Sequence, residues 1–309
     1  MHSLGGLVSK AIVIFNPAKV REVDPFKESL GKVAQENGFE LEYIETAEED
    51  PGFEMAAQAR EAKPDLVIVA GGDGTVRVVT TELRETGIPV AILPAGTTNL
   101  LARNLGISMN MDEAIQTAFA GRTLKFDLVK VTLGQGKDPK YFTGMAGVGI
   151  DAEVMHGVED KLKKLVGPGA YVMSFLQQVG SSPCRVKVTI DDTRVLKRKT
   201  TLLMVGNTAE LTGGVKLFPE ADPTDGSLEL LLGAPTGFAS WLKVIGGVLT
   251  GKRKNQEMEY FTGKKFTVEI AQPTVWEMDG DAEDPAQSWT FEVLPGALSV
   301  CAGELSESK

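Results

Sequence analysis

The sequence predicts an α/β fold with two domains: an N-terminal parallel-sheet domain over residues 1–125 and a β-rich, mainly antiparallel domain over residues 126–294. Three observations support this prediction. The first 125 residues alternate short apolar runs with helical patterns, which indicates a parallel sheet covered by helices. From about residue 122 the pattern changes to longer stretches of alternating apolar and polar residues. The length of 309 residues is sufficient for two domains.

In the N-terminal half, apolar runs of strand length alternate with stretches that have the spacing of amphipathic helices. The strand-like runs are residues 11–16, 40–46, 65–71 and 89–93. Helices are expected near residues 25–37, 52–62 and 75–86, followed by shorter helical pieces at 100–105 and 111–120. Ligands bind parallel sheets of this kind at the carboxyl ends of the strands, so we expect function in the loops that follow them.

The C-terminal half consists mainly of strand-like stretches. LKFDLVKVTL, RVKVTIDD, TLLMVGNT, SLELLLG and KKFTVEI alternate apolar with polar residues, as strands of an antiparallel sheet do. Helical insertions are expected at 151–179 and 236–250. The last strand-like run, EVLPGALSVCAG, extends into residues 295–309, and its pattern leaves open whether it returns to the first domain.

The composition limits the classes of function. With 32 Lys+Arg and 42 Asp+Glu the formal net charge is −10, which argues against a general nucleic-acid-binding protein but leaves a local basic patch open. Two cysteines and two histidines argue against a disulfide framework, a zinc site or a histidine-based triad. No apolar run is long enough to span a bilayer. We therefore expect a soluble, cytoplasmic protein that is at most peripheral to a membrane.

A glycine-rich segment, Gly71-Gly72-Asp73-Gly74-Thr75, separates the third predicted strand from the helix after it. Backbone N–H groups converge at such a helix start, and glycines let a phosphate approach without a Cβ in the way. A carboxylate repels phosphate unless a cation such as Mg²⁺ lies between them. The segment therefore indicates a metal–nucleotide site; the alternative is an ordinary turn in which the aspartate caps a helix.

A second loop, LPAGTTNLLARNLG, follows the next strand in the same way. Gly96, Thr97, Thr98 and Asn99 offer N–H and O–H donors, and loops after neighbouring strands lie side by side. Helix capping is the alternative for these residues. A Walker loop and a GxGxxG fingerprint are both absent, which argues against the usual P-loop and dinucleotide-binding assignments.

These two loops and three later segments together resemble the diacylglycerol kinase catalytic family of lipid kinases, which includes sphingosine and ceramide kinases and many bacterial members. The later segments are FTGMAGVGIDAEV (142–154), VGNTAELTGGVKLFPEADPTDGSLEL (205–230) and MDGD (278–281). Five blocks in the family's order are more specific than any one of them. The resemblance implies an N-terminal nucleotide-binding domain and a C-terminal lipid-binding domain, with ATP in the cleft between them.

The resemblance also implies roles for individual residues. Nucleotide contacts are implied for Asn16, Thr46, Gly71, Gly72, Asp73, Gly74, Thr75 and Thr97. A catalytic base is implied at Asp279, and a structural Mg²⁺ site at Asp222, Asp225 and the backbone of Ser227. Phosphoryl transfer needs positioning, charge neutralisation and a group that accepts the hydroxyl proton, so the chemistry agrees. From the residues alone, MDGD is more typical of a turn, and DPTDG suits a turn or a metal loop equally.

Three positions depart from the family's pattern. NPAKV (16–20) lacks the glycine of the family's opening motif, Leu100 stands where many members have aspartate, and Asp281 stands where they have glutamate. Each departure weakens a detail of nucleotide or metal geometry and leaves the family assignment intact.

Two segments combine basic and apolar residues in the manner of interfacial helices: KLKKLVGPGAYVMSFLQQV (161–179) and FASWLKVIGGVLTGKRK (238–254). Packing against a core is the alternative for both. Because a net charge of −10 is repelled by an anionic membrane, membrane contact requires a localised basic patch.

The sequence thus predicts an ATP-dependent, Mg²⁺-requiring kinase that phosphorylates a lipid hydroxyl at a membrane surface, with diacylglycerol as one candidate acceptor. The enzyme alternative is an NAD kinase-like protein, which shares GGDGT but carries a TGSTAY-like segment that this chain lacks. The alternative from another class is a non-catalytic lipid-binding or lipid-sensing protein. No nucleic-acid partner is expected, and the acceptor, the nucleotide preference and the oligomeric state, a dimer included, stay open.

Overall fold

The computed structural model describes residues 8–120, 122–134, 138–148, 183–211, 215–234 and 258–303. The chain divides into two compact units, one formed by Met1–Phe126 with Gly296–Lys309 and the other by Asp127–Pro295. The helical insertions expected at 151–179 and 236–250, and the two segments expected to touch a membrane, lie outside the described residues.

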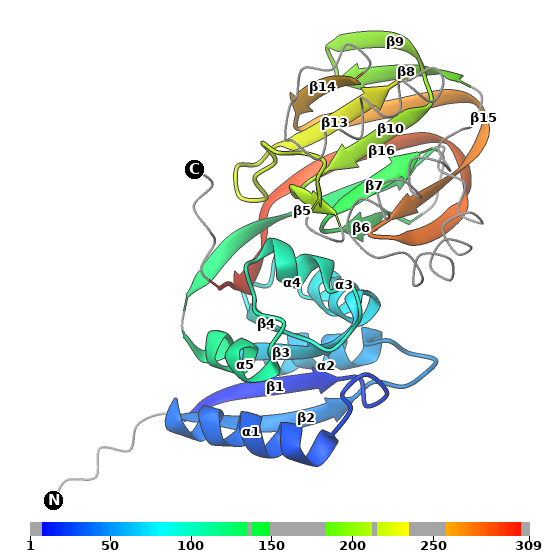
Figure 1. Cartoon of the computed structure of the whole chain (residues 1–309). Coiled ribbons are helices and arrows are strands. Elements are labelled where there is room, and N and C mark those ends of the chain that lie inside the picture. The colour runs from blue at the N-terminus through cyan, green and yellow to red at the C-terminus, as the bar shows by residue number, and fades with distance from the viewer. Residues whose placement is uncertain are drawn as a thin grey trace, which may run out of the picture. The chain divides into compact units, whose positions relative to one another are not determined.

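The N-terminal unit is built on a parallel sheet in the strand order β4-β3-β1-β2 (Figure 1). Its strands are β1 (Ser9–Phe15), β2 (Phe39–Glu45), β3 (Leu66–Gly71) and β4 (Pro89–Pro94). Every residue of β3 is buried, as expected for a central strand that is covered on both faces. Parallel pairing brings the carboxyl ends of all four strands to one edge of this sheet.

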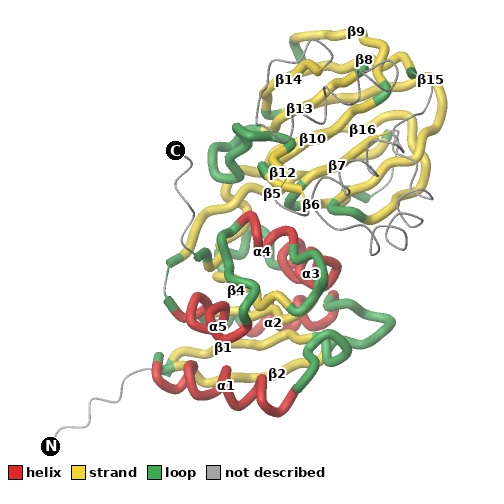
Figure 2. The backbone as a smooth tube through the Cα atoms, in the orientation of Figure 1, coloured by secondary structure: helices red, strands yellow, loops and turns green. Residues whose placement is uncertain are grey.

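The described residues of this unit form five helices; Figure 2 shows them in red. They are α1 (Val23–Glu36), α2 (Phe53–Ala62), α3 (Asp73–Glu82), α4 (Leu100–Asn104) and α5 (Met111–Phe119). Helix α1 packs against α5, and α2 packs against α3. The helical spacing of the apolar residues explains this, since Phe26, Leu30 and Val33 form the buried stripe of α1. No helix in the described part of the chain is long and apolar enough to cross a membrane.

The last strand, β16 (Asp281–Cys301), enters the N-terminal unit at its end. Ser299 and Val300 pair in parallel with Pro89 and Val90 of β4. Residues 297–301 are all buried, which is the pattern of a strand in a parallel sheet rather than of a strand with one solvated face. The run that the sequence left open therefore returns to the first sheet.

The second unit is an antiparallel β-structure. Its strands are β5 (Thr123–Leu133), β6 (Lys140–Phe142), β7 (Met145–Val148), β8 (Cys184–Ile190), β9 (Arg194–Thr200), β10 (Leu202–Gly206), β11 (Glu210–Leu211), β12 (Val215–Lys216), β13 (Leu228–Gly233), β14 (Met258–Gly263) and β15 (Lys265–Met278), together with most of β16. The predicted fold class, α/β with an N-terminal parallel sheet and a C-terminal antiparallel part, is confirmed.

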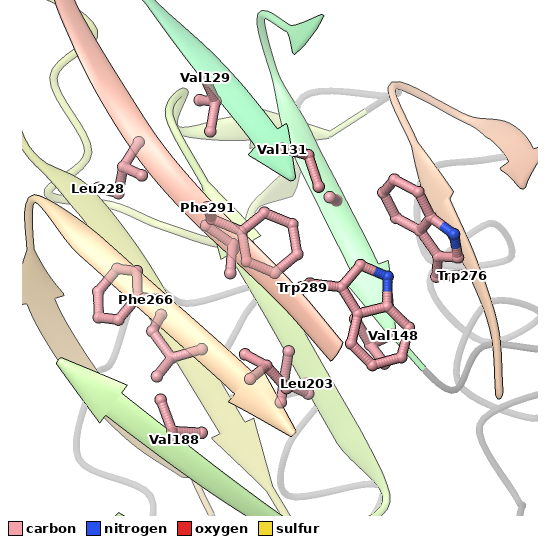
Figure 3. Packing of buried hydrophobic residues seen from close by; sticks show 14 of the residues in the cluster. Val129, Val131, Val148, Val188, Leu203, Leu228, Phe266, Trp276, Trp289 and Phe291 are labelled. Atoms are coloured by element: carbon pink, nitrogen blue, oxygen red, sulfur yellow. The ribbon is translucent and has the colours of Figure 1, made fainter. Parts of the chain in front are cut away.

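Alternating side chains of these strands form one apolar core in the second unit (Figure 3). Trp276 of β15 and Trp289 of β16 are fully buried in it, with ring centroids 6.3 Å apart in an edge-on arrangement. Phe266 and Phe291 are also fully buried. Phe266 and Phe291 are direct cross-strand partners in the pairing of β15 with β16, and the turn between these two strands is MDGD.

Candidate active site

The GGDGT segment lies where the sequence predicts it, between β3 and α3. Helix α3 begins at Asp73, two residues earlier than predicted, and its N-cap is Gly72 in an extended conformation. Glycine supplies no capping side chain, so the first N–H groups of α3 are not satisfied by the N-cap residue. Gly74 in the first turn is exposed, and a Cβ added to it would meet no atom within 4 Å. The segment thus presents backbone donors of the kind that bind a phosphate.

The two glycine loops touch at the level of the backbone. A Cβ placed on Gly96 would lie 2.6 Å from the Cα of Gly72, far inside van der Waals contact. The N–H of Ala95 also donates to the carbonyl oxygen of Gly71, at 3.0 Å. Only glycine at position 96 permits this approach, whereas a Cβ on Gly72 would lie 3.5 Å from the Cα of Gly96, an ordinary contact distance, so the packing requirement falls on Gly96.

Replacing Gly96 with alanine is expected to destabilise the protein by about 1–3 kcal/mol, because the backbones of the two loops must separate. Gly74→Ala is the matched control, since a Cβ there meets nothing within 4 Å. Chemical denaturation of both variants measures the difference. Equal stabilities for Gly96→Ala and Gly74→Ala would contradict the close approach.

Asp73 joins the two loops through its carboxylate. Its Oδ2 accepts the N–H of Asn99 at 3.0 Å, and its Oδ1 accepts the N–H of Leu100 at 2.6 Å. Asn99 and Leu100 are the N-cap and the first residue of α4, so Asp73 caps the helix of the neighbouring loop. A metal ion bound directly to this carboxylate would compete with these two donors.

Asn99 closes the second loop on itself. Its Oδ1 accepts the N–H of Gly96 at 2.9 Å, and its Nδ2 donates to the carbonyl oxygen of Gly96 at 2.8 Å. The residue adopts a left-handed conformation, with φ of 49°, which asparagine tolerates. Asn99 therefore shapes the loop, whereas the sequence suggested it as a ligand donor. Thr97 at the tip of the loop is exposed.

The remaining predicted nucleotide contacts follow the ends of β1, β2 and β3. Asn16 comes directly after β1, where its Oδ1 accepts the N–H of Ala18 and its own N–H donates to Ala70. Thr46 comes directly after β2 and is 6% exposed, and its Oγ1 has no hydrogen-bond partner among the described residues. A buried hydroxyl without a partner is costly, so Thr46 fits a site that is completed by a ligand or water. Thr75 is buried in the first turn of α3.

The structure therefore gathers the predicted nucleotide-binding residues at one edge of the parallel sheet. We call the set Asn16, Thr46, Gly71–Thr75 and Thr97 the glycine-loop site. Two independent features suit a polyphosphate: backbone donors at the start of α3 and the unsatisfied hydroxyl of Thr46.

Asp279 lies in the second unit, in the turn from β15 to β16. Its Oδ2 accepts the N–H and the Oγ1–H of Thr143 at 3.0 and 3.2 Å, and its Oδ1 accepts the N–H groups of Gly144 and Met145 at 2.8 and 3.1 Å. Its φ of 50° is left-handed. Asp279 is thus a turn residue of intermediate exposure whose carboxylate fixes residues 143–145.

Glu277, two residues earlier, is a buried carboxyl group that the sequence analysis did not identify. Its Oε2 accepts the N–H of Gly280 at 2.9 Å. Burial raises the pKa of Glu277 from 4.5 to about 8; the N–H of Gly280 opposes this rise, and the negative charges of Asp279 and Asp281 add to it. The alternation of β15 places Glu277 opposite the core-facing Trp276 and Met278, so the pattern indicated an exposed side chain.

The predicted metal loop, DPTDG, is shaped by its own aspartates. Oδ1 of Asp222 accepts the N–H and hydroxyl of Thr224, and Oδ1 of Asp225 accepts the N–H of Ser227 at 2.7 Å. The second oxygen of each carboxylate has no hydrogen bond to a described residue. In the part of the chain that is described, no group of three or more acidic, His or Cys side chains could hold a metal ion. Two free carboxylate oxygens are nevertheless compatible with Mg²⁺, which keeps several of its water ligands.

A buried polar network connects this loop with the segment that Asp279 holds. Asp127 is 1% exposed, and its Oδ2 accepts the N–H of Gly226 at 2.7 Å. The Nδ2 of Asn207, also 1% exposed, donates to the carbonyl oxygens of Asp127 and Thr143 at 3.0 and 2.8 Å. Sequence reasoning missed Asp127, although an aspartate inside the apolar run LKFDLVKV was a usable signal.

A sheet edge that suits a polyphosphate, followed by an antiparallel unit with an anchored aspartate, defines the class of protein: a two-domain phosphotransferase. Two family models match the chain, "Diacylglycerol kinase catalytic domain" over residues 10–131 and "YegS C-terminal NAD kinase beta sandwich-like domain" over residues 144–302. The chain belongs to the diacylglycerol kinase family of lipid kinases and is an enzyme of the kinase class.

Curated relatives match along most of their length. The chain is 29% identical to the diacylglycerol kinase of Bacillus subtilis over 282 residues, which cover 89% of this chain and 90% of the relative. It is 30% identical over 280 residues to a Pectobacterium atrosepticum protein named probable lipid kinase YegS-like, again covering 89% and 90%. A crystal structure of a diacylglycerol kinase from Bacillus anthracis has a TM-score of 0.73 at 23% identity, covering 97% of this chain and 98% of that one, which supports the same fold.

Proposed function

We propose that the protein is an ATP-dependent lipid kinase that transfers the γ-phosphate to a lipid hydroxyl, with diacylglycerol as the first candidate acceptor. One observation carries the nucleotide part of this proposal: the residues of the glycine-loop site follow four adjacent strands of one parallel sheet. The acceptor part rests on family membership and on the names of the relatives, which are diacylglycerol kinase and lipid kinase.

In this proposal, the residues of the N-terminal unit bind and orient the nucleotide. The first N–H groups of α3 point to the phosphates, and the hydroxyl of Thr46 gains the hydrogen bond that it lacks. Asp73 keeps the two loops at a fixed separation through its hydrogen bonds to Asn99 and Leu100. When bound, Mg-ATP supplies the phosphoryl group, a charge-neutralising cation and ADP as the leaving group.

Asp279 receives the proton of the acceptor hydroxyl while the oxygen of that hydroxyl forms its bond to the γ-phosphorus. A carboxylate has about four acceptor positions, and four hydrogen bonds already occupy those of Asp279. One donor must therefore turn away. The hydroxyl of Thr143, which makes the longest of the four bonds, at 3.2 Å, can do so by rotation about its C–O bond, whereas the backbone donors are fixed.

A structural Mg²⁺, separate from that of the nucleotide, has candidate ligands in the DPTDG loop. Asp222 and Asp225 would hold the structural ion through their free oxygens, with the backbone of Ser227 as a further ligand.

The lipid acceptor brings the protein to a membrane surface, and we expect this contact at the cytoplasmic face.

Transfer of labelled γ-phosphate from Mg-ATP to diacylglycerol, sphingosine and ceramide in mixed micelles, with NAD as a competing acceptor, tests the proposal. Labelled phosphatidic acid is the expected product. Label on NAD would replace the proposal with an NAD kinase activity. Nucleotide binding without transfer to any acceptor would instead favour a lipid-binding protein without catalysis.

A further inference from the structure

A strongly basic hairpin is the feature of the second unit that the proposed reaction does not use. Strands β8 and β9 form this hairpin at one border of the sheet (Figure 2), and β9 pairs with no described strand other than β8. Residues 184–200 contain six basic and two acidic residues, in a chain whose net charge is −10. We call β8 and β9 the basic hairpin.

The strand register places like charges directly opposite one another. Arg185 pairs with Lys199 across the two strands, and Lys187 pairs with Lys197. All four side chains are exposed on the same side of the hairpin, while the alternate positions of β8 are buried in the core. Directly opposed like charges destabilise a strand pair, so the basic hairpin is charged at the expense of stability.

Acidic side chains compensate for little of this charge. Lys187 forms an ion pair with Glu269 of β15, in which both side chains are nearly half exposed. Arg185, Lys197 and Lys199 have no ion pair with any described residue. One of the four cations is therefore neutralised by an ion pair and three are not, so this side of the hairpin stays positive overall.

Protection of a sheet edge accounts for only half of the arrangement. Lysines on an edge strand prevent pairing with another chain, which explains Lys197 and Lys199 on β9. Arg185 and Lys187 lie on β8, which is flanked by β9 on one side and by β15 on the other and so has no free edge. Two pairs of opposed cations therefore indicate a partner with many negative charges.

An exposed aliphatic side chain lies among these cations. Val195 is 53% exposed and shares its side of β9 with Lys197 and Lys199 by the alternation of the strand. Cations around an exposed apolar side chain suit a bilayer surface, where the cations meet anionic headgroups and the apolar group enters the interface.

We propose that the side of the basic hairpin formed by Arg185, Lys187, Val195, Lys197 and Lys199 docks the protein on an anionic phospholipid membrane. The proposal deepens the proposed function, because a lipid acceptor lies in such a membrane. It supplies the localised basic patch that a chain of net charge −10 requires, within residues that the structure describes.

Co-sedimentation with vesicles tests the docking without nucleotide or turnover. Phosphatidylcholine vesicles with and without phosphatidylglycerol are compared, and binding is expected only with phosphatidylglycerol and is expected to weaken with added salt. The double variants Arg185→Gln/Lys187→Gln and Lys197→Gln/Lys199→Gln should each weaken binding about thirtyfold. Lys10→Gln/Lys32→Gln, which removes two exposed charges from the N-terminal unit, is the matched control and should leave binding nearly unchanged.

Three results would overturn the proposal: unchanged vesicle binding in both hairpin variants, an equal loss in the control variant, or tighter binding to RNA or DNA than to vesicles. Aggregation of the β9 variant alone, with normal vesicle binding by the β8 variant, would leave edge protection as the whole explanation.

A kinase assay separates this proposal from the proposed function. The hairpin variants should phosphorylate a water-soluble, short-chain diacylglycerol normally and a vesicle-embedded one slowly. Vesicle binding with no transfer to either would reject the kinase proposal and keep the docking surface.

Discussion

Replacing Asp279 with asparagine is expected to lower the rate of phosphate transfer by about 10²–10⁴, because an amide cannot accept the proton of the acceptor hydroxyl. The measurement is the steady-state rate at saturating Mg-ATP and lipid. The KM for the nucleotide should change little, since Asp279 lies in the second unit and the glycine-loop site in the first.

A structural contribution of Asp279 must be separated from a catalytic one. Asparagine keeps one acceptor oxygen, so two of the four donors in residues 143–145 lose their partner, which costs about 1–3 kcal/mol for each buried group. Thr143→Val is the control, because it removes one hydrogen bond to Asp279 and keeps the carboxylate. It should lower stability and retain most of the activity. A comparable loss of activity in Thr143→Val would show that order in this segment, rather than proton transfer, limits the rate.

Glu277 is expected to make the stability of the protein fall as the pH rises from 4.5 to about 8. In the unfolded chain the pKa of this carboxyl is near 4.5, and in the fold it is about 8, so between these values the folded state holds a proton that the unfolded state has lost. The stabilisation is complete below pH 4.5 and is lost progressively up to pH 8, with a total of at most about 5 kcal/mol.

Chemical denaturation across this pH range, with Glu277→Gln alongside, measures the effect. Glutamine is neutral at every pH and keeps an oxygen for the N–H of Gly280, so the variant should lose this part of the pH dependence and exceed the wild type in stability above pH 8. Glu269→Gln on the same strand is the matched control, because it makes the same change at a side chain that is 45% exposed. A wild-type slope in Glu277→Gln would mean that this carboxyl is ionised in the fold.

Local sequence patterns predicted most of the fold. The apolar runs at 11–16 and 65–71 correspond to β1 and β3, and the alternation in RVKVTIDD corresponds to β8. These predictions succeed because the periods of 3.6 and 2 residues reflect which side chains of one element face a core, which is a local property. The glycine loops were predictable for the same reason, since a strand, a run of glycines and a helix start are adjacent in the chain.

The groups that the charged residues contact could not be predicted from the sequence, because the tertiary structure decides them. Asp73 was expected beside a metal ion, and it caps a helix that begins 27 residues later. Glu277 sits at a position whose alternation indicates solvent, yet it is buried beside Asp279 and Gly280. The opposed cations of β8 and β9 depend on the register between strands, which a single-strand pattern does not contain.

The sequence by itself determined the order of strands and helices in the N-terminal unit and the positions of the glycine loops, because each of these depends on residues that are near one another in the chain. The resemblance to the lipid kinases was also readable from the sequence, because it rests on five segments in a fixed order along the chain. Only the tertiary structure decided that Asp73 links two loops, that Glu277 is buried with a raised pKa and that four cations share one exposed face. Hydrogen bonding, burial and register depend on residues that are distant in sequence and that only the folded chain brings together.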